Sequence, residues 1–264
     1  MEFVIYLLYI LAGAGVGLAI GLTGVGGGSL MTPLLILFGF EYNVAIGTDL
    51  LYAAITKSSG VVAHQRRGNI NWRLVLLLGL GSIPASIFTA FLLDQFFTSA
   101  ADYKPVLTKS LGVMLFLTSL VLIFRKRLQK TAIESPGVAN RWVQRHSAPI
   151  TLLVGIALGV FVTLSSVGAG AFCAAVLLLL YPRLPALHVV GTDIAHAVPL
   201  TFIAGMGHFL LLGNVDFVLL GCLLLGSLPA IHFGTLLGSK LPNHVMLPFL
   251  ASILMALGVK FAFF

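Results

Sequence analysis

Charged residues are scarce in this chain of 264 amino acids. Asp, Glu, Lys and Arg make up only 9% of it, against about 25% in an ordinary soluble domain. A soluble fold needs a polar surface, so this scarcity excludes a soluble globular enzyme, and the 59% of hydrophobic residues excludes a disordered chain. The two cysteines, Cys173 and Cys222, are too few for a secreted disulfide scaffold and form no metal-ligand spacing. The composition indicates a polytopic membrane protein.

Acidic residues are fewer than basic ones, and the formal net charge is +7. In a membrane protein such an excess sets the orientation of the chain in the bilayer, because basic residues gather in cytoplasmic loops. We therefore expect no nucleic-acid partner. The first residues, MEFVIYLLYI, have an acidic rather than a basic start and no small-residue cleavage site before the glycines. We interpret them as a retained membrane segment and not as a signal peptide.

Apolar runs, cut at charges, prolines and glycine clusters, divide the chain into ten pieces. They cover residues 4–22, 28–40, 44–63, 73–93, 105–124, 149–165, 169–181, 189–211, 216–238 and 245–264. We therefore predict an N-terminal membrane repeat over 1–124, a basic cytoplasmic linker over 125–147 and a C-terminal membrane repeat over 148–264, together forming one transport domain.

The two halves resemble each other in sequence. The run IGTD at 46–49 returns as VGTD at 190–193, and GSIPA at 81–85 returns as GSLPA at 226–230. At the first of these spacings Gly24 and Gly26 match Gly168 and Gly170, and His64 matches His208. Several short matches in one order indicate an internal duplication.

The second piece of each half is too short to cross a membrane. Residues 28–40 span about 20 Å as a helix, against a hydrocarbon core of about 30 Å. A glycine cluster precedes the short piece in each half, and glycine permits sharply turned backbone. Each half is therefore expected to open with a broken or re-entrant helix pair followed by three spans. The number of crossings per half is odd in either case, which predicts two repeats of inverted topology in an all-α integral membrane protein.

Basic residues are distributed unevenly over the loops of this topology. One side holds Arg66, Arg67, Arg73, Arg125, Lys126, Arg127, Lys130, Arg141, Arg145, Arg183 and Lys240, whereas the other holds Lys104, Lys109 and Lys260. The positive-inside rule makes the first side cytoplasmic. Both termini are then predicted to lie outside a cell membrane.

Broken helices in a duplicated membrane protein are typical of secondary transporters, whose substrate lies near the midplane between the repeats. A helix start exposes backbone N–H groups with partial positive charge, which favours an anion. The candidate substrate-binding residues are Thr23, Gly24, Gly26, Gly27, Gly28, Ser29, Ser165, Ser166, Gly168 and Gly170. The alternative is that the glycines only let helices pack closely.

Lys57 is the one basic residue well inside an apolar span, AAITKSSGVVA. A buried ionisable group is costly in a membrane and is by default a functional candidate, so we include Lys57 among the substrate-binding residues. The alternative is that its ammonium snorkels to the cytoplasmic edge, about two helical turns away.

Four further residues are candidates for proton coupling or gating: Asp49, Asp193, His208 and His64. Each aspartate follows Gly-Thr and could cap a helix start, carry a coupling proton or pair with a buried cation. A histidine titrates near neutral pH, but it could equally be a bonded residue of the helix bundle. No H-x-x-x-H or C-x-x-C spacing supports a metal site, and no metal or cofactor is expected.

Four segments in this order carry a resemblance to a known family. TGVGGGSLMTPLL (23–35), AIGTDLLYAAITK (45–57), HQRRGNINW (64–72) and GSIPAS (81–86) are similar to the sulfite exporter TauE/SafE family. With the weaker second copy, which reads GAGAF in place of GGGSL, the similarity covers nearly the whole chain. Asp49 and Asp193 stand where Ser is expected in many members.

This resemblance implies a multi-pass permease, without a soluble cofactor, for sulfite, sulfoacetate, other organosulfonates and related small anions. The expected function is secondary transport of such an anion by alternating access, with proton coupling as an option. Two alternatives from other classes stay open. Buried His and Asp residues would permit a divalent metal-cation transporter or channel. An intramembrane phosphatase would also have re-entrant halves, but it would need clustered carboxylates, so we expect no enzyme.

Overall fold

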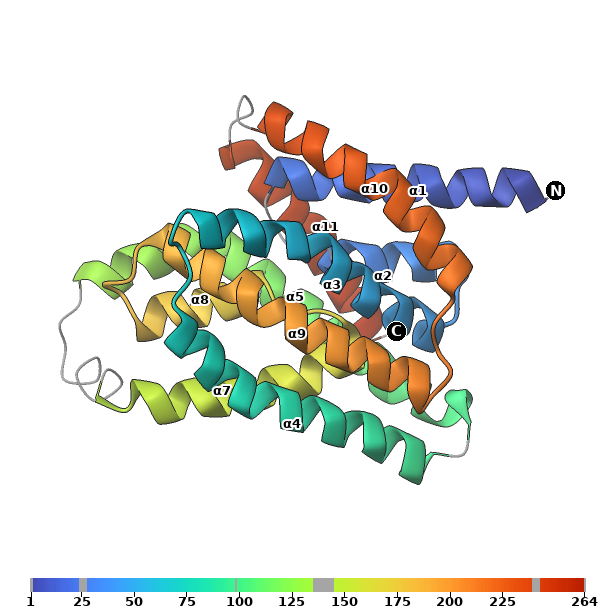
Figure 1. Ribbon diagram of the computed structural model, residues 1–264, viewed down its shortest axis with the longest axis horizontal. Coiled ribbons are helices and arrows are strands. Elements are labelled where there is room, and N and C mark those ends of the chain that lie inside the picture. Colours follow the sequence, from blue (N-terminus) through green and yellow to red (C-terminus); the bar gives the residue numbers. More distant parts are fainter. Residues whose placement is uncertain (1, 24–27, 98, 135–144, 239–242, 264) are drawn as a thin grey trace.

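Helices form nearly all of the computed structural model, which describes residues 2–23, 28–97, 99–134, 145–238 and 243–263 (Figure 1). The described residues contain no strand. The helices of the first half are α1 (Glu2–Thr23), α2 (Gly28–Leu37), α3 (Tyr42–Arg66), α4 (Trp72–Phe96) and α5 (Ala100–Glu134). Those of the second half are α7 (Ser147–Ser165), α8 (Ala171–Leu180), α9 (Ala186–Leu210), α10 (Phe217–Gly238) and α11 (Asn243–Phe263).

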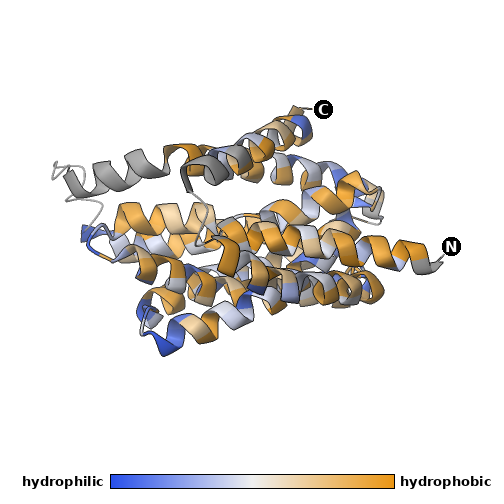
Figure 2. Ribbon diagram, turned by 90° about the horizontal axis from the view of Figure 1, so that it is seen from above, coloured by the Kyte–Doolittle hydropathy of each residue, from blue (hydrophilic) through white to orange (hydrophobic). Residues whose placement is uncertain are grey.

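Six of the described helices are long and apolar enough to cross a membrane: α1, α4, α5, α7, α9 and α10. Their outer faces carry large exposed apolar side chains, such as Leu80 and Leu225. Hydrophobic residues follow the lengths of the helices, and hydrophilic ones gather mostly at their ends (Figure 2). Exposed apolar surface on this scale is stable only in lipid, so the prediction of an all-α integral membrane protein is confirmed.

Each of the ten apolar pieces overlaps one described helix, and two pieces differ from their helices in ways that matter. The short helix α2 ends at Leu37, earlier than the expected piece 28–40, because the chain turns through Gly39 with a positive φ of 89°. Helix α5 continues to Glu134 and so includes the first part of the expected linker 125–147. The segment RKRLQK consists of good helix formers, which lets the helix continue beyond the apolar run.

The opening pair of each half folds back on itself as a hairpin. In the first half, the ring of Tyr9 near the start of α1 lies 5.4 Å from that of Phe40, just beyond α2. In the second half, the hydroxyls of Thr151 near the start of α7 and Tyr181 at the end of α8 are 2.8 Å apart. Both short helices thus return toward the side from which the longer helix started.

Reciprocal contacts join the two halves. The backbone N–H of Asn71 donates to the Thr192 hydroxyl over 3.0 Å, and the backbone N–H of Asp216 donates to the Thr48 hydroxyl over 3.1 Å. Thr48 and Thr192 are the matching residues of IGTD and VGTD. These contacts place α3 and α9 side by side at the centre of the molecule (Figure 1), where both aspartates of the repeated motif lie.

Candidate functional site

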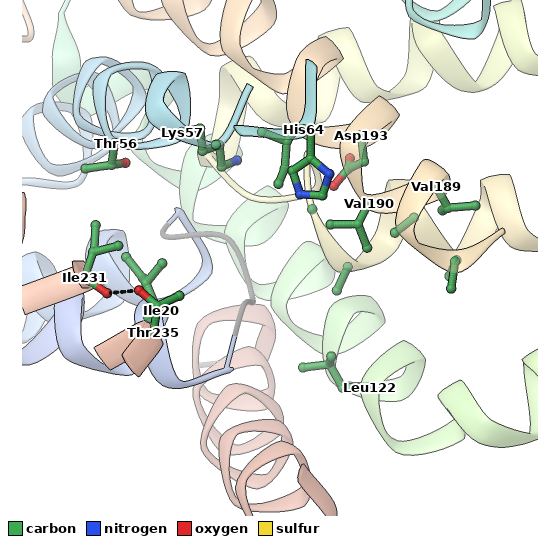
Figure 3. A pocket seen from close by; sticks show the side chains of 18 of the residues that line it. Ile20, Thr56, Lys57, His64, Leu122, Val189, Val190, Asp193, Ile231 and Thr235 are labelled. Carbon is green, nitrogen blue, oxygen red and sulfur yellow. Dashed lines mark hydrogen bonds between the residues drawn. The ribbon is translucent and has the colours of Figure 1, made fainter. Parts of the chain in front are cut away.

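A cavity of about 330 Å³ opens between helices of both halves (Figure 3). Its walls come from α1, α3, α5, α8, α9 and α10, and most of them are aliphatic. The polar side chains in its lining are Thr56, Lys57, Ser59, His64, Asp193 and Thr235. A mostly apolar cavity with a few polar groups suits a small ligand that those groups orient.

Lys57 reaches from α3 of the first half into the break of the second half. Its Nζ donates a 2.7 Å hydrogen bond to the carbonyl oxygen of Ala169, between α7 and α8. The nearest interacting charges are the carboxylates of Asp193 and Asp49. The ammonium is therefore directed toward the helix break that borders the cavity.

The break between α7 and α8 depends on two residues with left-handed backbone. Ser166 has a φ of 56° and Gly168 a φ of 122°. The Ser165 hydroxyl, fully buried, donates to the Phe161 carbonyl and accepts from the Val167 N–H, which fixes the turn. Helix α8 then begins at Ala171, which lines the cavity beside Gly170. The Cys173 N–H already donates to the Gly168 carbonyl, so of this first turn the N–H groups of Ala171 and Phe172 are left for a ligand.

Asp49 belongs to α3 and is buried where this helix packs against α2. One carboxylate oxygen, Oδ2, accepts hydrogen bonds from both the backbone N–H and the hydroxyl of Thr32. The Ser166 hydroxyl lies beside the same carboxylate. Within the described ranges, neither Asp49 Oδ1 nor Ser166 Oγ has a hydrogen-bond partner. Asp49 thus binds α2 at Thr32 and does not cap its own helix, and it lies beside Ser166 of the α7–α8 break.

Asp193 occupies the matching position on α9 but lies in the cavity wall. Its carboxylate is near the Lys57 ammonium and the Cys173 thiol of α8. Its Oδ1 atom has no hydrogen-bond partner among the described residues. The two aspartates of the duplicated motif therefore differ in access, since one borders open space and the other is sealed.

The two matching histidines also occupy unlike surroundings. His64 is half-buried at the end of α3 and lines the cavity. His208 is fully buried, and its Nε2 lies 2.9 Å from the Thr163 carbonyl oxygen. The structure brings His64 toward Lys57 and Asp193, whereas it places His208 away from the cavity.

The remaining candidates belong to the first break. Gly24, Gly26 and Gly27 lie outside the described residues. Thr23 ends α1, Gly28 begins α2, and Ser29 is buried in the first turn of α2.

Sequence reasoning missed the roles of Thr32 and Cys173, which contact Asp49 and Asp193 respectively. The signal for Thr32 was a hydroxyl in an apolar helix, one turn after Ser29.

Sequence reasoning also missed a polar contact between His196 and Ser82. The His196 Nε2 atom lies 2.8 Å from the Ser82 hydroxyl, and both residues are fully buried. Ser82 belongs to the repeated run GSIPA, whose small residues let α4 approach the second half. This contact joins α4 to α9, which is one of the helices that line the cavity.

Comparison with known proteins agrees with this architecture. The family described as "Sulfite exporter TauE/SafE" matches residues 9–261. The probable membrane transporter protein YjnA of Bacillus subtilis (strain 168) is 37% identical over 95% of this chain and 97% of its own length. The probable membrane transporter protein YdhB of the same organism is 30% identical over 87% and 89%.

A relative also occurs in an archaeon. The probable membrane transporter protein MJ0441 of Methanocaldococcus jannaschii is 27% identical over 98% of this chain and 96% of its own length. No solved structure gives a significant match. The helix breaks, the buried polar groups and these full-length matches agree: the chain belongs to the sulfite exporter TauE/SafE family of membrane transporters.

Proposed function

We propose that the protein is a secondary transporter that moves a small sulfur-containing anion, such as sulfite or an organosulfonate, across the cell membrane. The observation that carries this proposal is the position of Lys57. Its ammonium lies at a helix break, in the wall of a cavity that a small anion fits. A fixed positive charge and the first N–H groups of a helix both favour an anion there. The family's printed description, a sulfite exporter, supports this substrate class.

The carboxylate of Asp193 limits when an anion can bind. Asp193 and Lys57 interact in the same cavity wall, so a charged aspartate offsets the lysine and repels an anion. A protonated Asp193 leaves the lysine charge for the substrate. Anion and proton therefore bind together, and the protein couples anion movement to proton movement in the same direction. Asp49, the second carboxylate that interacts with Lys57, is sealed in this state and would take this role when the two halves exchange access.

The difference between the two halves supports alternating access. Lys57, Gly60 and His64 line the open cavity. Their counterparts one repeat later, Thr201, Ala204 and His208, are 0%, 1% and 0% exposed. We interpret this arrangement, with an open site in one half and a tightly packed counterpart in the other, as one of two access states. Exchange of the two environments between the halves would open the opposite end.

The proposal includes the predicted topology. The repeats cover 1–124 and 148–264, with the basic segment 125–147 in the cytoplasm and both termini outside. With each opening pair counted as a hairpin, the remaining helices are α3, α4 and α5 in one half and α9, α10 and α11 in the other, which is the odd number per half that inverted repeats require. The reciprocal Thr48 and Thr192 contacts fit halves related by a two-fold axis. The cavity then opens to the cytoplasm, since His64 and Ala186 lie at that end.

The test is transport of radiolabelled sulfite into proteoliposomes, with an inward proton gradient and without one. We expect gradient-stimulated uptake by the natural protein and its loss in Lys57→Ala. The matched control is Lys109→Ala, an exposed lysine of α5 outside the cavity. Equal uptake by both variants would contradict a substrate role for Lys57. Transport of divalent metal ions without any sulfur anion would replace the proposal with a cation transporter.

A further inference from the structure

A second cavity, of about 490 Å³, lies apart from the Lys57 site. It is formed by the start of α4, the start of α7, and the end of α8 with the loop that follows. Helix α4 belongs to the first half and the other elements to the second half. No residue lines both cavities.

Two arginines line this cavity, Arg73 at the start of α4 and Arg183 in the loop after α8. In the part of the chain that the structure describes, neither guanidinium has an acidic partner or a hydrogen bond. Asn71, Ser147 and Tyr181 add polar groups to the same walls. Two guanidinium groups around one hollow favour a ligand that carries an oxyanion, because guanidinium binds such groups through paired hydrogen bonds.

Part of the cavity wall is apolar. Leu74, Leu77, Leu180 and Leu184 line it, and α4 continues from there with Leu76 and Leu80 exposed by 65% and 67%. Trp72, exposed by 48% directly before Arg73, is a residue type that concentrates at the membrane–water interface. The arginines thus lie at headgroup depth, with lipid-facing leucines one to two turns deeper.

The matching place at the other end of the molecule lacks these charges. The reciprocal contacts pair Asn71 with Asp216, which puts Val218 opposite Arg73 in the duplicated arrangement. Val218 is exposed and apolar, and the neighbouring charge is acidic. The arginine pair is therefore confined to one face of the membrane and is not a by-product of the duplication.

We propose that this cavity binds the headgroup of an anionic phospholipid such as phosphatidylglycerol. The phosphate lies between Arg73 and Arg183, and an acyl chain follows the leucines of α4. A free anion of the same charge would use the arginines but would gain nothing from the leucines. Basic hollows between membrane helices suit anionic lipid headgroups. This inference does not depend on the substrate proposed above.

The experiment is native mass spectrometry of the full chain in detergent with added lipid. Phosphatidylglycerol and phosphatidylcholine of equal chain length are compared on the natural protein, on Arg73→Gln/Arg183→Gln and on Arg66→Gln/Arg145→Gln. The last variant loses the same charge from exposed sites outside the cavity. We expect preferential phosphatidylglycerol binding that the cavity variant loses by roughly tenfold and the control keeps. Unchanged melting temperatures without lipid verify that both variants fold.

Three results would overturn the inference. Equal loss in the two variants would assign lipid binding to the general basic surface. Equal binding of the two lipids would remove the role of headgroup charge. Displacement of phosphatidylglycerol by inorganic phosphate or sulfite, or by its deacylated headgroup at equal concentration, would make the cavity a site for free anions.

Discussion

The Nζ atom of Lys57 and the carbonyl oxygen of Ala169 are 2.7 Å apart, although 112 residues separate them in the chain. Their contact joins the central helix of one half to the helix break of the other. A buried ammonium needs acceptors, and a helix break supplies unpaired carbonyls close to unpaired N–H groups. The same break can therefore hold the lysine and, beside it, the anion that the lysine attracts.

Replacing Lys57 by Met should abolish the sulfite-induced rise in melting temperature of purified protein. Charge-assisted hydrogen bonds contribute about 1.5–3 kcal/mol, so affinity should fall about tenfold to a hundredfold. Thermal-shift titrations at matched ionic strength measure this, because a ligand that binds the folded state stabilises it. Arg at this position keeps the charge and should retain part of the affinity. Full sulfite affinity in Lys57→Met would reject the role of the charge.

Asp193→Asn should make anion binding insensitive to pH. In the natural protein a protonated Asp193 permits binding, so sulfonate affinity should fall as the pH rises and the carboxyl ionises. Asn is always neutral, so the variant should bind as well at high pH as the natural protein does at low pH. Titration calorimetry with sulfoacetate at several pH values tests this. A variant with unchanged pH dependence would place the coupling elsewhere.

Thr32→Val should destabilise the protein more than the same change at a threonine whose hydroxyl bonds only within its own helix. It removes the hydroxyl donor to Asp49 and leaves a buried carboxylate with fewer partners, a loss of about 1–3 kcal/mol. For a protein of this size that corresponds to a lower melting temperature by roughly 2–10 °C. Thr108→Val is the control, because its hydroxyl bonds only to Lys104 of its own helix. Equal melting temperatures for the two variants would show that the Thr32 contact adds no stability.

Gly168→Ala should impair both folding and transport. Gly168 has a φ of 122°, which residues with a side chain rarely adopt, and an added Cβ would lie 2.7 Å from the Met114 Cε atom. Gly221→Ala, in a helix with no heavy atom within 4 Å of the added Cβ, should be neutral or slightly stabilising. Melting temperature and sulfite uptake distinguish the pair. A Gly168 variant that behaves like the Gly221 variant would show that the break tolerates a side chain.

Cysteines placed at the two matching histidines should react differently with a membrane-impermeant maleimide. His64→Cys lies at the open cavity and should be labelled, whereas His208→Cys is buried and should be protected. Cys173 and Cys222 are first replaced by Ala and Ser to remove the native thiols. Labelling of His64→Cys only in inside-out vesicles would support the proposed orientation. Labelling only from outside would reverse it.

Much of the fold could be predicted because membrane helices are set by the lengths of apolar runs. The ten segments and both helix breaks follow from runs between charges and from glycine clusters such as Gly168 and Gly170. The extension of α5 to Glu134 could not be predicted in this way, because it depends on helix propensity in a charged segment. Hydropathy also does not indicate which helices pair across the two halves.

The residues of the candidate site could be predicted from their types, but the residues that they contact could not. The scarcity of charge made Lys57, Asp49 and Asp193 conspicuous in apolar spans. Their contacts with Ala169, Thr32 and Cys173 depend on how the hairpins fold back, which no local pattern encodes. The duplication made His64 and His208 joint candidates for proton coupling or gating, whereas the structure gives them different access.

The reciprocal threonine contacts also bear on how the protein is made. The first half leaves the ribosome and enters the membrane before the second half exists. Until then the Thr48 hydroxyl lacks the Asp216 amide, and Lys57 lacks the Ala169 carbonyl. The first five helices must therefore wait in the bilayer with these polar groups on α3 unpaired. Lys57 gains its partner once the α7–α8 break is made, and the packing around Thr48 is complete only when the start of α10 has been synthesised.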